Sequence, residues 1–216
     1  MSAAPAQVSR QIPVIGLTGG IASGKSTVSR WLADWGAHII DADQVGHAVI
    51  APDGEAYPEV ILAFGTEILN EDGTISRPRL GKRIFSDPEA RLRLNEISHP
   101  LMGERMAGEI RHLRALESPH PPPLILLDAA ILFEAKWDTL CDRVWSVQCD
   151  PDRAVERLMT RNSLSREEAQ ARLNAQLRNA ERARLAHVVI ANDGTFEELR
   201  DKVKALWQEQ TGLKVR

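Results

Sequence analysis

The sequence is short of the features that mark several other classes of protein. It contains two cysteines among 216 residues, Cys141 and Cys149, with no further cysteine pair or nearby histidine to build a metal site. Reduced thiols are the simplest reading, which favours a protein of the cytoplasm. No apolar run approaches the roughly eighteen residues that a membrane span needs. We therefore expect neither a thiolate metal centre nor an association with membranes.

An excess of charge of either sign is also lacking. The chain has 27 lysines and arginines against 30 aspartates and glutamates, a net charge of −3. This balance gives no electrostatic footprint for DNA or RNA, so nucleic acid is not an expected partner. Residues 1–11 lack the apolar centre of a signal peptide and are expected to be a frayed terminus. A length of 216 residues, 43% of them hydrophobic, suits one α/β core with an inserted subdomain.

One stretch near the beginning of the chain organises the rest. Val14–Leu17 is an apolar, β-branched run that predicts a short buried strand. Gly19–Ser26 then fits the pattern G-x-x-x-x-G-K-[ST]. Apolar residues at helical spacing follow directly: Val28, Trp31, Leu32 and Trp35. Gly36 is placed to end that helix, so strand, loop and helix come in the order that a phosphate-binding loop requires.

The chemistry of this loop follows from its residue types. Glycines allow backbone N–H groups to turn toward an anion, and the helix N-terminus adds a partial positive charge. Lys25 would reach the β- and γ-phosphates of a nucleotide, and the Ser26 hydroxyl would bind Mg²⁺. The plainer alternative is a glycine-rich turn that only caps a helix, but both flanks agree with the motif. The stretch predicts that the chain binds a nucleoside triphosphate.

Four further apolar segments predict the rest of a sheet. These segments are Ala37–Ile40, Leu124–Asp128, Arg143–Cys149 and His187–Ile190. Because they alternate with helical patterns, the sheet should be parallel with helices on both faces. Capping boxes predict two of the later helix starts, at Ser165–Glu168 for a helix through about Ala183 and at Thr195–Glu198 for the last helix.

The segment from residue 44 to about 116 contains no convincing strand and predicts an inserted helical subdomain. Asp87-Pro88 is an N-cap followed by proline at the first helical position. His99-Pro100 is expected to open a second helix, and Asn70–Gly73 predicts a turn.

Carboxylates follow the predicted strands at the edge where ligands bind in open parallel sheets. Asp41 and Asp43 come after the second strand and Asp128 after the third, beside Lys25 and Ser26 from the first. A kinase needs one carboxylate to accept the proton of the acceptor hydroxyl and others to hold Mg²⁺ or its waters. Either Asp41 or Asp43 could instead cap a helix that begins near Gln44, and Asp41 could be turned away from the crevice.

An arginine-rich segment lies between the fourth and fifth strands. It contains eight arginines and no lysine: Arg153, Arg157, Arg161, Arg166, Arg172, Arg178, Arg182 and Arg184. A helical lid that brings arginine to phosphate would use such residues, whereas a solvated helix face paired with glutamates is the plainer alternative for most of them. Arg157 and Arg161 lie one turn apart and are the two expected to act on the nucleotide. Because no N-K-x-D motif reads guanine, the pattern favours a small-molecule kinase over a GTPase.

Over about residues 13–210 the chain resembles the dephospho-coenzyme A kinase family. The resemblance rests on an ordered set of motifs: Gly16–Ser26, Asp41–Asp43, Asp72–Arg77, Phe85–Pro88, Ile97–Leu101, Asp128–Glu134 and Ile190–Gly194. It implies transfer of the γ-phosphoryl group of ATP, with Mg²⁺, to the 3′-hydroxyl of dephospho-coenzyme A. The sequence departs from the family pattern at Ala22 (a mild change if its φ stays negative), at Ser76 and at Ala130.

The resemblance also implies a fold and its division. The fold is the α/β P-loop nucleoside triphosphate hydrolase fold of nucleotide-kinase type, with a five-stranded parallel sheet. Residues 12–43 and 117–210 would form the nucleotide-binding core, with a helical lid at about 152–184. Residues 44–116 would form the helical subdomain that binds the coenzyme A moiety. A monomer or small homo-oligomer is expected.

Site residues follow from the loop pattern and the resemblance together. Those expected to act in catalysis are Lys25, Asp43 as general base, and Arg157. Those expected to bind ATP are Gly19, Gly20, Ile21, Ala22, Ser23, Gly24, Lys25, Ser26, Thr27, Arg161 and Asn192, with Ser26 on the metal. Those expected to bind the acceptor are Asp43, Arg77, His99 and Asp128, although His99 could equally cap a helix that begins at Pro100.

Two rival functions remain open from the sequence. One is a kinase for another small acceptor, such as a nucleoside monophosphate or gluconate, which would lack the Asp-Ala-Asp, His-Pro and Asn-Asp-Gly set in this order. The other is an ATP-dependent switch that hydrolyses ATP only with a protein partner. Stimulation of ADP release by a small acceptor would distinguish either kind of kinase from the switch.

Overall fold

The computed structural model describes residues 11–215. The expected frayed terminus, residues 1–11, lies outside the described residues apart from Gln11. No helix within 11–215 is long and apolar enough to cross a membrane.

A five-stranded parallel sheet forms the centre of the molecule, in the order β2-β3-β1-β4-β5. Its strands are β1 (Val14–Gly19), β2 (His38–Asp41), β3 (Ile125–Asp128), β4 (Arg143–Gln148) and β5 (Val188–Ala191). The predicted α/β fold with five parallel strands is confirmed. Strand β3 lies between β1 and β2, and its Asp128 is paired with Leu17 of β1 and with Asp41 of β2. The carboxyl ends of these three strands therefore lie at one edge of the sheet.

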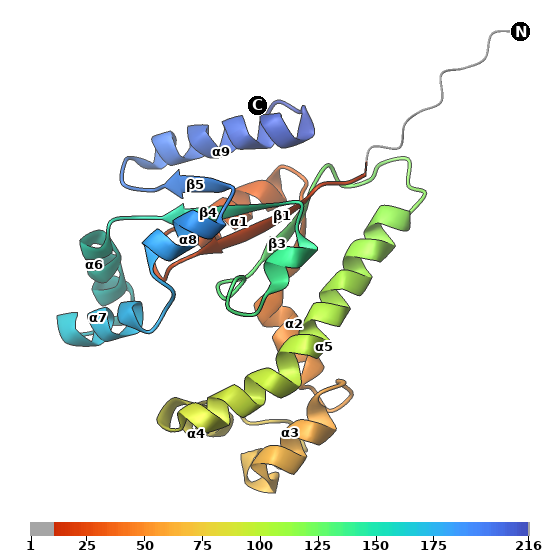
Figure 1. Ribbon diagram of the computed structural model, residues 1–216, viewed down its shortest axis with the longest axis vertical. Helices are drawn as coiled ribbons and strands as arrows, with labels where there is room; N and C mark the ends of the chain where they lie inside the picture. Colours follow the sequence, from red (N-terminus) through yellow and green to blue (C-terminus); the bar gives the residue numbers. More distant parts are fainter. Residues whose placement is uncertain (1–10, 216) are drawn as a thin grey trace, which may run out of the picture.

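Helices surround the sheet and fill the connections between strands. Their bounds are α1 (Lys25–Asp34), α2 (Ala42–Val49), α3 (Tyr57–Phe64), α4 (Arg77–Ser86), α5 (Pro88–Ala115), α6 (Pro151–Asn162), α7 (Arg166–Asn174), α8 (Asn179–Leu185) and α9 (Phe196–Thr211). Two short 3₁₀ turns are η1 (Thr66–Ile68) and η2 (Trp137–Leu140). Figure 1 shows α9 beside the strands and α2 to α5 extending away from them.

The two faces of the sheet carry separate apolar cores, because successive strand side chains point to opposite faces. Ile15 and Leu17 pack with α1 and α9, where Trp31 and Trp207 are buried. Val14 and its same-face neighbours Ile125 and Leu127 pack instead toward α2 and α5. The strongly apolar strands are thereby covered on both sides, as a central parallel sheet requires.

The segment between β2 and β3 consists of helices and turns, with one isolated bridge between Leu69 and Ile75. The predicted turn at Asn70–Gly73 is present, with Gly73 at φ +80°. The expected new helix at Pro100 is wrong, because α5 runs without interruption from Pro88 to Ala115. Proline removes one backbone donor and crowds the preceding turn, which bends a helix without always ending it. Figure 1 shows α5 changing direction about half-way along.

The arginine-rich segment forms three helices. The capping box at Ser165 is confirmed, since its hydroxyl accepts a hydrogen bond from the N–H of Glu168. The expected helix through Ala183 is wrong, because α7 ends at Asn174 and α8 begins at Asn179. A carboxylate oxygen of Glu181 accepts the N–H of Arg178 at 3.2 Å, which gives α8 an N-terminal cap of its own.

Candidate active site

The loop between β1 and α1 is built to turn backbone N–H groups toward one side. Gly24 adopts φ +100°, which glycine tolerates, and a side chain there would clash with Asn192. Asn192 donates from Nδ2 to the carbonyl of Ser23 at 2.7 Å, so the loop after β5 supports the loop after β1. Helix α1 begins at Lys25, with its N-terminus at the end of the loop.

Ala22 is the residue at which the loop departs from expectation. Alanine here is a mild change only if its φ stays negative, but the φ of Ala22 is +60°. Left-handed backbone is unfavourable for residues with a Cβ, so the loop holds Ala22 in a strained conformation. Nη1 of Arg157 donates to the Ala22 carbonyl at 3.3 Å and thus helps to fix it.

A cavity of about 550 Å³ opens along this loop, and we call it the loop cavity. Its lining includes every residue from Gly19 to Thr27 together with Ala130, Arg157, Arg161, Gln176, Asn192, Gly194, Phe196 and Leu199. The structure therefore brings together all the residues that the sequence predicted to bind ATP. The volume lies in the range of small-molecule sites.

The two selected arginines have different surroundings. Arg157 is half-buried, and its guanidinium donates to the carbonyls of Ala22 and Asn192, each at 3.3 Å. It links the loop after β1 to the loop after β5. Arg161 is exposed, lines the loop cavity and donates from Nε to Oδ1 of Asn162 at 3.0 Å.

Two aspartates, Asp41 and Asp128, are paired at the carboxyl edge of the sheet, and Asp43 follows in α2. Asp41 caps α2, because its Oδ1 accepts the N–H groups of Asp43 at 2.9 Å and Gln44 at 3.3 Å. The capping alternative thus holds for Asp41, while Asp43 lies exposed in the first turn of α2. Asp128 forms a salt bridge with Nζ of Lys25, and both side chains are largely buried.

Arg77 and His99 lie apart from the loop cavity and from each other. Arg77 begins α4 and lines a cavity of about 270 Å³ with His47 and Thr74. His99 lines a separate cavity of about 260 Å³, edge-on to Trp137 with ring centroids 5.3 Å apart. Burial lowers the pKa of His99, which favours the neutral imidazole. The alternative that His99 caps a helix is wrong, because it lies inside α5.

Sequence reasoning missed two residues beside the loop. Oε1 of Gln176 accepts the backbone N–H of Ile21 at 2.8 Å, and Arg182 is 1% exposed next to Gly20. Arg182 was one of eight arginines without a distinguishing spacing, and no sequence signal marks Gln176. Gln176 lies in the break between α7 and α8, and Arg182 lies in α8. The sequence predicted one continuous helix through this region and therefore did not predict the break.

Fold and site together define a P-loop kinase of nucleotide-kinase type, since the glycine loop after β1, its lysine and two arginines of α6 line one cavity. A family model described as "Dephospho-CoA kinase" matches residues 13–198. The chain belongs to the dephospho-CoA kinase family. It is therefore a kinase, and the family's reaction is the final step of coenzyme A synthesis.

Individual relatives agree with this assignment. A dephospho-CoA kinase of Carboxydothermus hydrogenoformans is 44% identical over 198 residues, covering 92% of this chain and 94% of that one. A crystal structure from Thermus thermophilus shares 32% identity with a TM-score of 0.75, covering 94% of this chain and 100% of that one. The dephospho-CoA kinase of Campylobacter jejuni, at 21% identity and a TM-score of 0.64, shows the same fold over 94% of this chain and 100% of its own.

Proposed function

We propose that the chain transfers the γ-phosphoryl group of ATP to the 3′-hydroxyl of dephospho-coenzyme A. The observation that carries the proposal is the loop cavity, whose lining unites the glycine loop, Lys25 and Asn192. Backbone N–H groups of the loop and the N-terminus of α1 suit the phosphates. Arg157 and Arg161 line the same cavity, where their charge would offset that of the phosphates.

The proposed transfer uses Asp43 as the proton acceptor. The bond from Pγ to the bridging oxygen breaks and leaves its electron pair on ADP, while a bond forms between Pγ and the 3′-oxygen. The proton of the 3′-hydroxyl passes to the carboxylate of Asp43. This role is supported by the exposed position of Asp43 near the sheet edge, in contrast to Asp41, whose carboxylate is used by α2. Lys25 would leave Asp128 to bind the β- and γ-phosphates.

Mg²⁺ fits the residues that are present. Ser26 is exposed in the first turn of α1, directly after Lys25. No cluster of three or more histidine, cysteine, aspartate or glutamate side chains within 11–215 could hold a metal alone. This donor set suits an ion held mainly by nucleotide phosphates and water, with the Ser26 hydroxyl as protein ligand. When bound, Mg²⁺ neutralises the charge that develops on the phosphates.

The remaining parts of the proposal concern the acceptor and the setting. Residues 44–116 would bind the coenzyme A moiety, with Arg77 and His99 in two subsites, since each lines a cavity of its own, that of His99 together with residues from Ala135 to Leu140. Residues 12–43 and 117–210 would form the nucleotide core with the lid at 152–184. We also propose work in the cytoplasm as a monomer or small homo-oligomer, supported for the compartment by two free thiols.

The test is ADP release with ATP and Mg²⁺, with and without dephospho-coenzyme A. Adenosine, AMP, CMP and gluconate serve as parallel acceptors. We expect strong stimulation by dephospho-coenzyme A only, with a product heavier by one phosphate. Stimulation by another acceptor instead would retain the kinase and reject this substrate. Absence of stimulation by every acceptor would favour the switch alternative.

A further inference from the structure

Arg182 is a buried cation beside the glycine loop, and the nucleotide residues predicted from the sequence do not include it. It belongs to α8 and is 1% exposed. Nη1 donates to the carbonyl of Leu177 at 2.6 Å, and Nη2 lies 3.7 Å from Oε1 of Glu134. Burial lowers the pKa of Arg182 and Glu134 raises it, but a guanidinium stays charged near neutral pH. A charge at this depth requires compensation.

The existing partners leave this compensation incomplete. Nε of Arg182 is buried and has no hydrogen-bond partner among residues 11–215. The Glu134 carboxylate is beyond ordinary hydrogen-bond length and is one-third exposed. Buried polar atoms in native proteins are nearly always paired, so an unpaired donor on a buried cation points to an anionic ligand.

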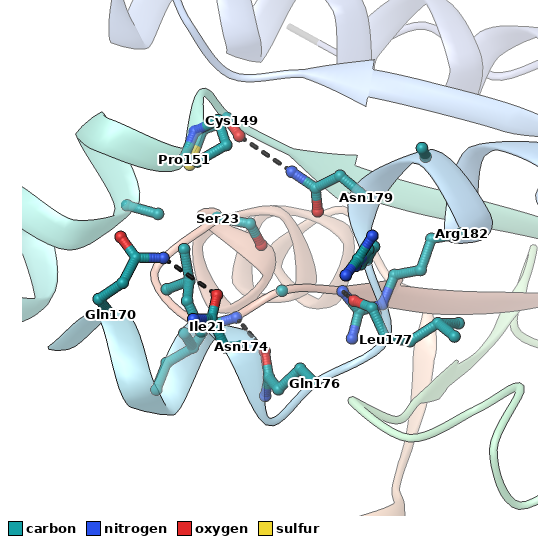
Figure 2. A pocket seen from close by; sticks show the side chains of 15 residues that line it. Ile21, Ser23, Cys149, Pro151, Gln170, Asn174, Gln176, Leu177, Asn179 and Arg182 are labelled. Carbon is teal, nitrogen blue, oxygen red and sulfur yellow. Dashed lines mark hydrogen bonds between the residues drawn. The ribbon is translucent and has the colours of Figure 1, made fainter. Parts of the chain in front are cut away.

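Arg182 is aimed at the glycine loop. A Cβ built on Gly20 would lie 3.4 Å from Nη1 of Arg182, 3.5 Å from Oδ1 of Asn179 and 3.8 Å from Oε1 of Gln176. Three polar side chains from the segment after α7 therefore converge on the open side of Gly20. Figure 2 shows Arg182 extending from α8 toward the loop, with Gln176 and Asn179 around the same space.

This space is a second cavity, of about 540 Å³, that adjoins the loop cavity. We call it the α8 cavity. The two cavities share Gly20, Ile21, Ser23 and Gln176 in their linings. Ser23 is 3% exposed, and its hydroxyl is a second buried polar atom without a partner in the described part of the chain. The α8 cavity is thus lined by two residues with an unsatisfied buried polar atom: Ser23, which it shares with the loop cavity, and Arg182.

The other lid arginines are less suited to the reacting phosphate. Both outer nitrogens of Arg157 already donate to backbone carbonyls, and Arg161 is exposed at the cavity edge. Arg182 combines burial and positive charge with an unused donor at Nε and an Nη2 that lies beyond ordinary hydrogen-bond length from Glu134, although its Nη1 donates to Leu177. In a site with little water, such a group stabilises developing negative charge far more than an exposed one.

We propose that Arg182 is a further catalytic residue, whose guanidinium binds the equatorial oxygens of the phosphoryl group during its transfer. This inference rests on the proposed function for the identity of the acceptor. Arg182 donates hydrogen bonds and exchanges no proton. The bonds broken and formed, and the passage of the proton to Asp43, are therefore those of the proposed transfer. Gln176 and Asn179 lie close to the same side of Gly20 as the guanidinium.

The test compares Arg182→Ala and Arg182→Lys with Arg184→Ala, which removes an exposed arginine from the same helix. We expect Arg182→Ala to lower kcat by about 100-fold or more, with the KM for ATP changed by less than about threefold. Lysine cannot present a planar fork, so Arg182→Lys should remain about tenfold or more below the wild type. Added guanidinium should restore part of the kcat of Arg182→Ala and leave Arg184→Ala unchanged.

A binding measurement separates this role from a purely structural one. ADP with aluminium fluoride imitates the transferring phosphoryl group, and it needs no acceptor. We expect Arg182→Ala to bind ADP with the affinity of the wild type. The factor by which aluminium fluoride increases the affinity for ADP should be at least about tenfold smaller in the variant than in the wild type.

Four results would overturn the proposal: wild-type kcat in Arg182→Ala, wild-type kcat in Arg182→Lys, equal loss of ADP and ADP–aluminium fluoride affinity, or no rescue by guanidinium. A wild-type chain that ignores dephospho-coenzyme A would reject the substrate and leave the aluminium fluoride comparison to decide on Arg182.

Discussion

Nζ of Lys25 and Oδ1 of Asp128 form a salt bridge that joins the start of α1 to the end of β3. Their side chains are 21% and 11% exposed, so the pair is largely withdrawn from water. Removing one member of such a pair leaves the other without compensation. The bridge therefore holds the ammonium at the loop cavity, where the proposed function requires a phosphate to replace the carboxylate as its partner.

Replacement of Lys25 by alanine should remove most turnover. The variant loses the charge that would bind the β- and γ-phosphates, so we expect kcat to fall by about 100-fold or more. Steady-state ADP release with dephospho-coenzyme A measures the effect. Lys214→Ala, which removes an exposed lysine outside both cavities, is the matched control and should keep wild-type turnover. A Lys25→Ala enzyme within threefold of the wild type would contradict the assignment.

The two aspartates of the Asp-Ala-Asp motif should separate into a chemical and a structural role. Asp43→Asn removes the proposed base, and we expect kcat to fall by about 100-fold or more with little change in the KM for ATP. Asp41→Ala removes the N-cap of α2, which should lower the free energy of unfolding by about 1 kcal/mol. Kinetics and urea denaturation of both variants measure the separation. An unchanged kcat in Asp43→Asn would remove Asp43 as the base.

Strands and loop could be predicted from sequence because their signals are local. The run Val14–Leu17 is apolar at every position, and the glycine pattern that follows dictates a loop at the sheet edge. The continuity of α5 through Pro100 could not be predicted, because the second half of the helix, although bent away from the first, is held by the burial of Met102 and Met106 in the core. Tertiary packing outweighed the local signal for a helix start.

The site also combines features that a local sequence signal predicts with features that depend on tertiary packing. Residues Gly19–Thr27 are neighbours in sequence, and their joint lining of the loop cavity follows from the motif. Arg182 and Glu134 approach each other only because α8 and the segment after β3 are brought together by the fold. Among eight arginines of similar spacing, burial alone distinguishes Arg182, and burial is a property of the folded chain.

Ala22→Gly should raise stability. At φ +60° alanine bears the left-handed penalty of about 1–2 kcal/mol, whereas glycine does not. Glycine also increases the conformational entropy of the unfolded chain, which lowers the free energy of unfolding by about 0.4–1 kcal/mol and offsets part of this gain. We expect a net increase of about 0.5–1 kcal/mol in the free energy of unfolding, measured by urea denaturation. Ala22→Val should destabilise, because a β-branched residue tolerates this conformation less. A glycine variant less stable than the wild type would show that the loop is not strained at Ala22.

Cys141 should be unreactive in the folded chain at mildly alkaline pH. Burial, with smaller contributions from Asp138 and Asp142, raises the pKa of the Cys141 thiol to about 12. At pH 8 the thiolate fraction should then be lower by roughly 1,000-fold than for an ordinary thiol, and the thiolate is the reactive form. Burial also raises the pKa of Cys149. Both thiols should react with a disulfide reagent only after denaturation, which serves as the positive control.

The same shift gives stability a pH dependence of known sign. The folded chain keeps the proton of Cys141 up to a pH near 12, while the unfolded chain releases it near the ordinary thiol pKa of about 9. The unfolded state therefore binds fewer protons between these values, and the contribution to stability falls as pH rises through this window. Replacing Cys141 with alanine should flatten this part of the stability profile from pH 9 to pH 11, measured by urea denaturation. Rapid labelling of native Cys141 at pH 8, or an unchanged slope in the variant, would show that the thiol titrates normally and that its surroundings are wetter than the structure indicates.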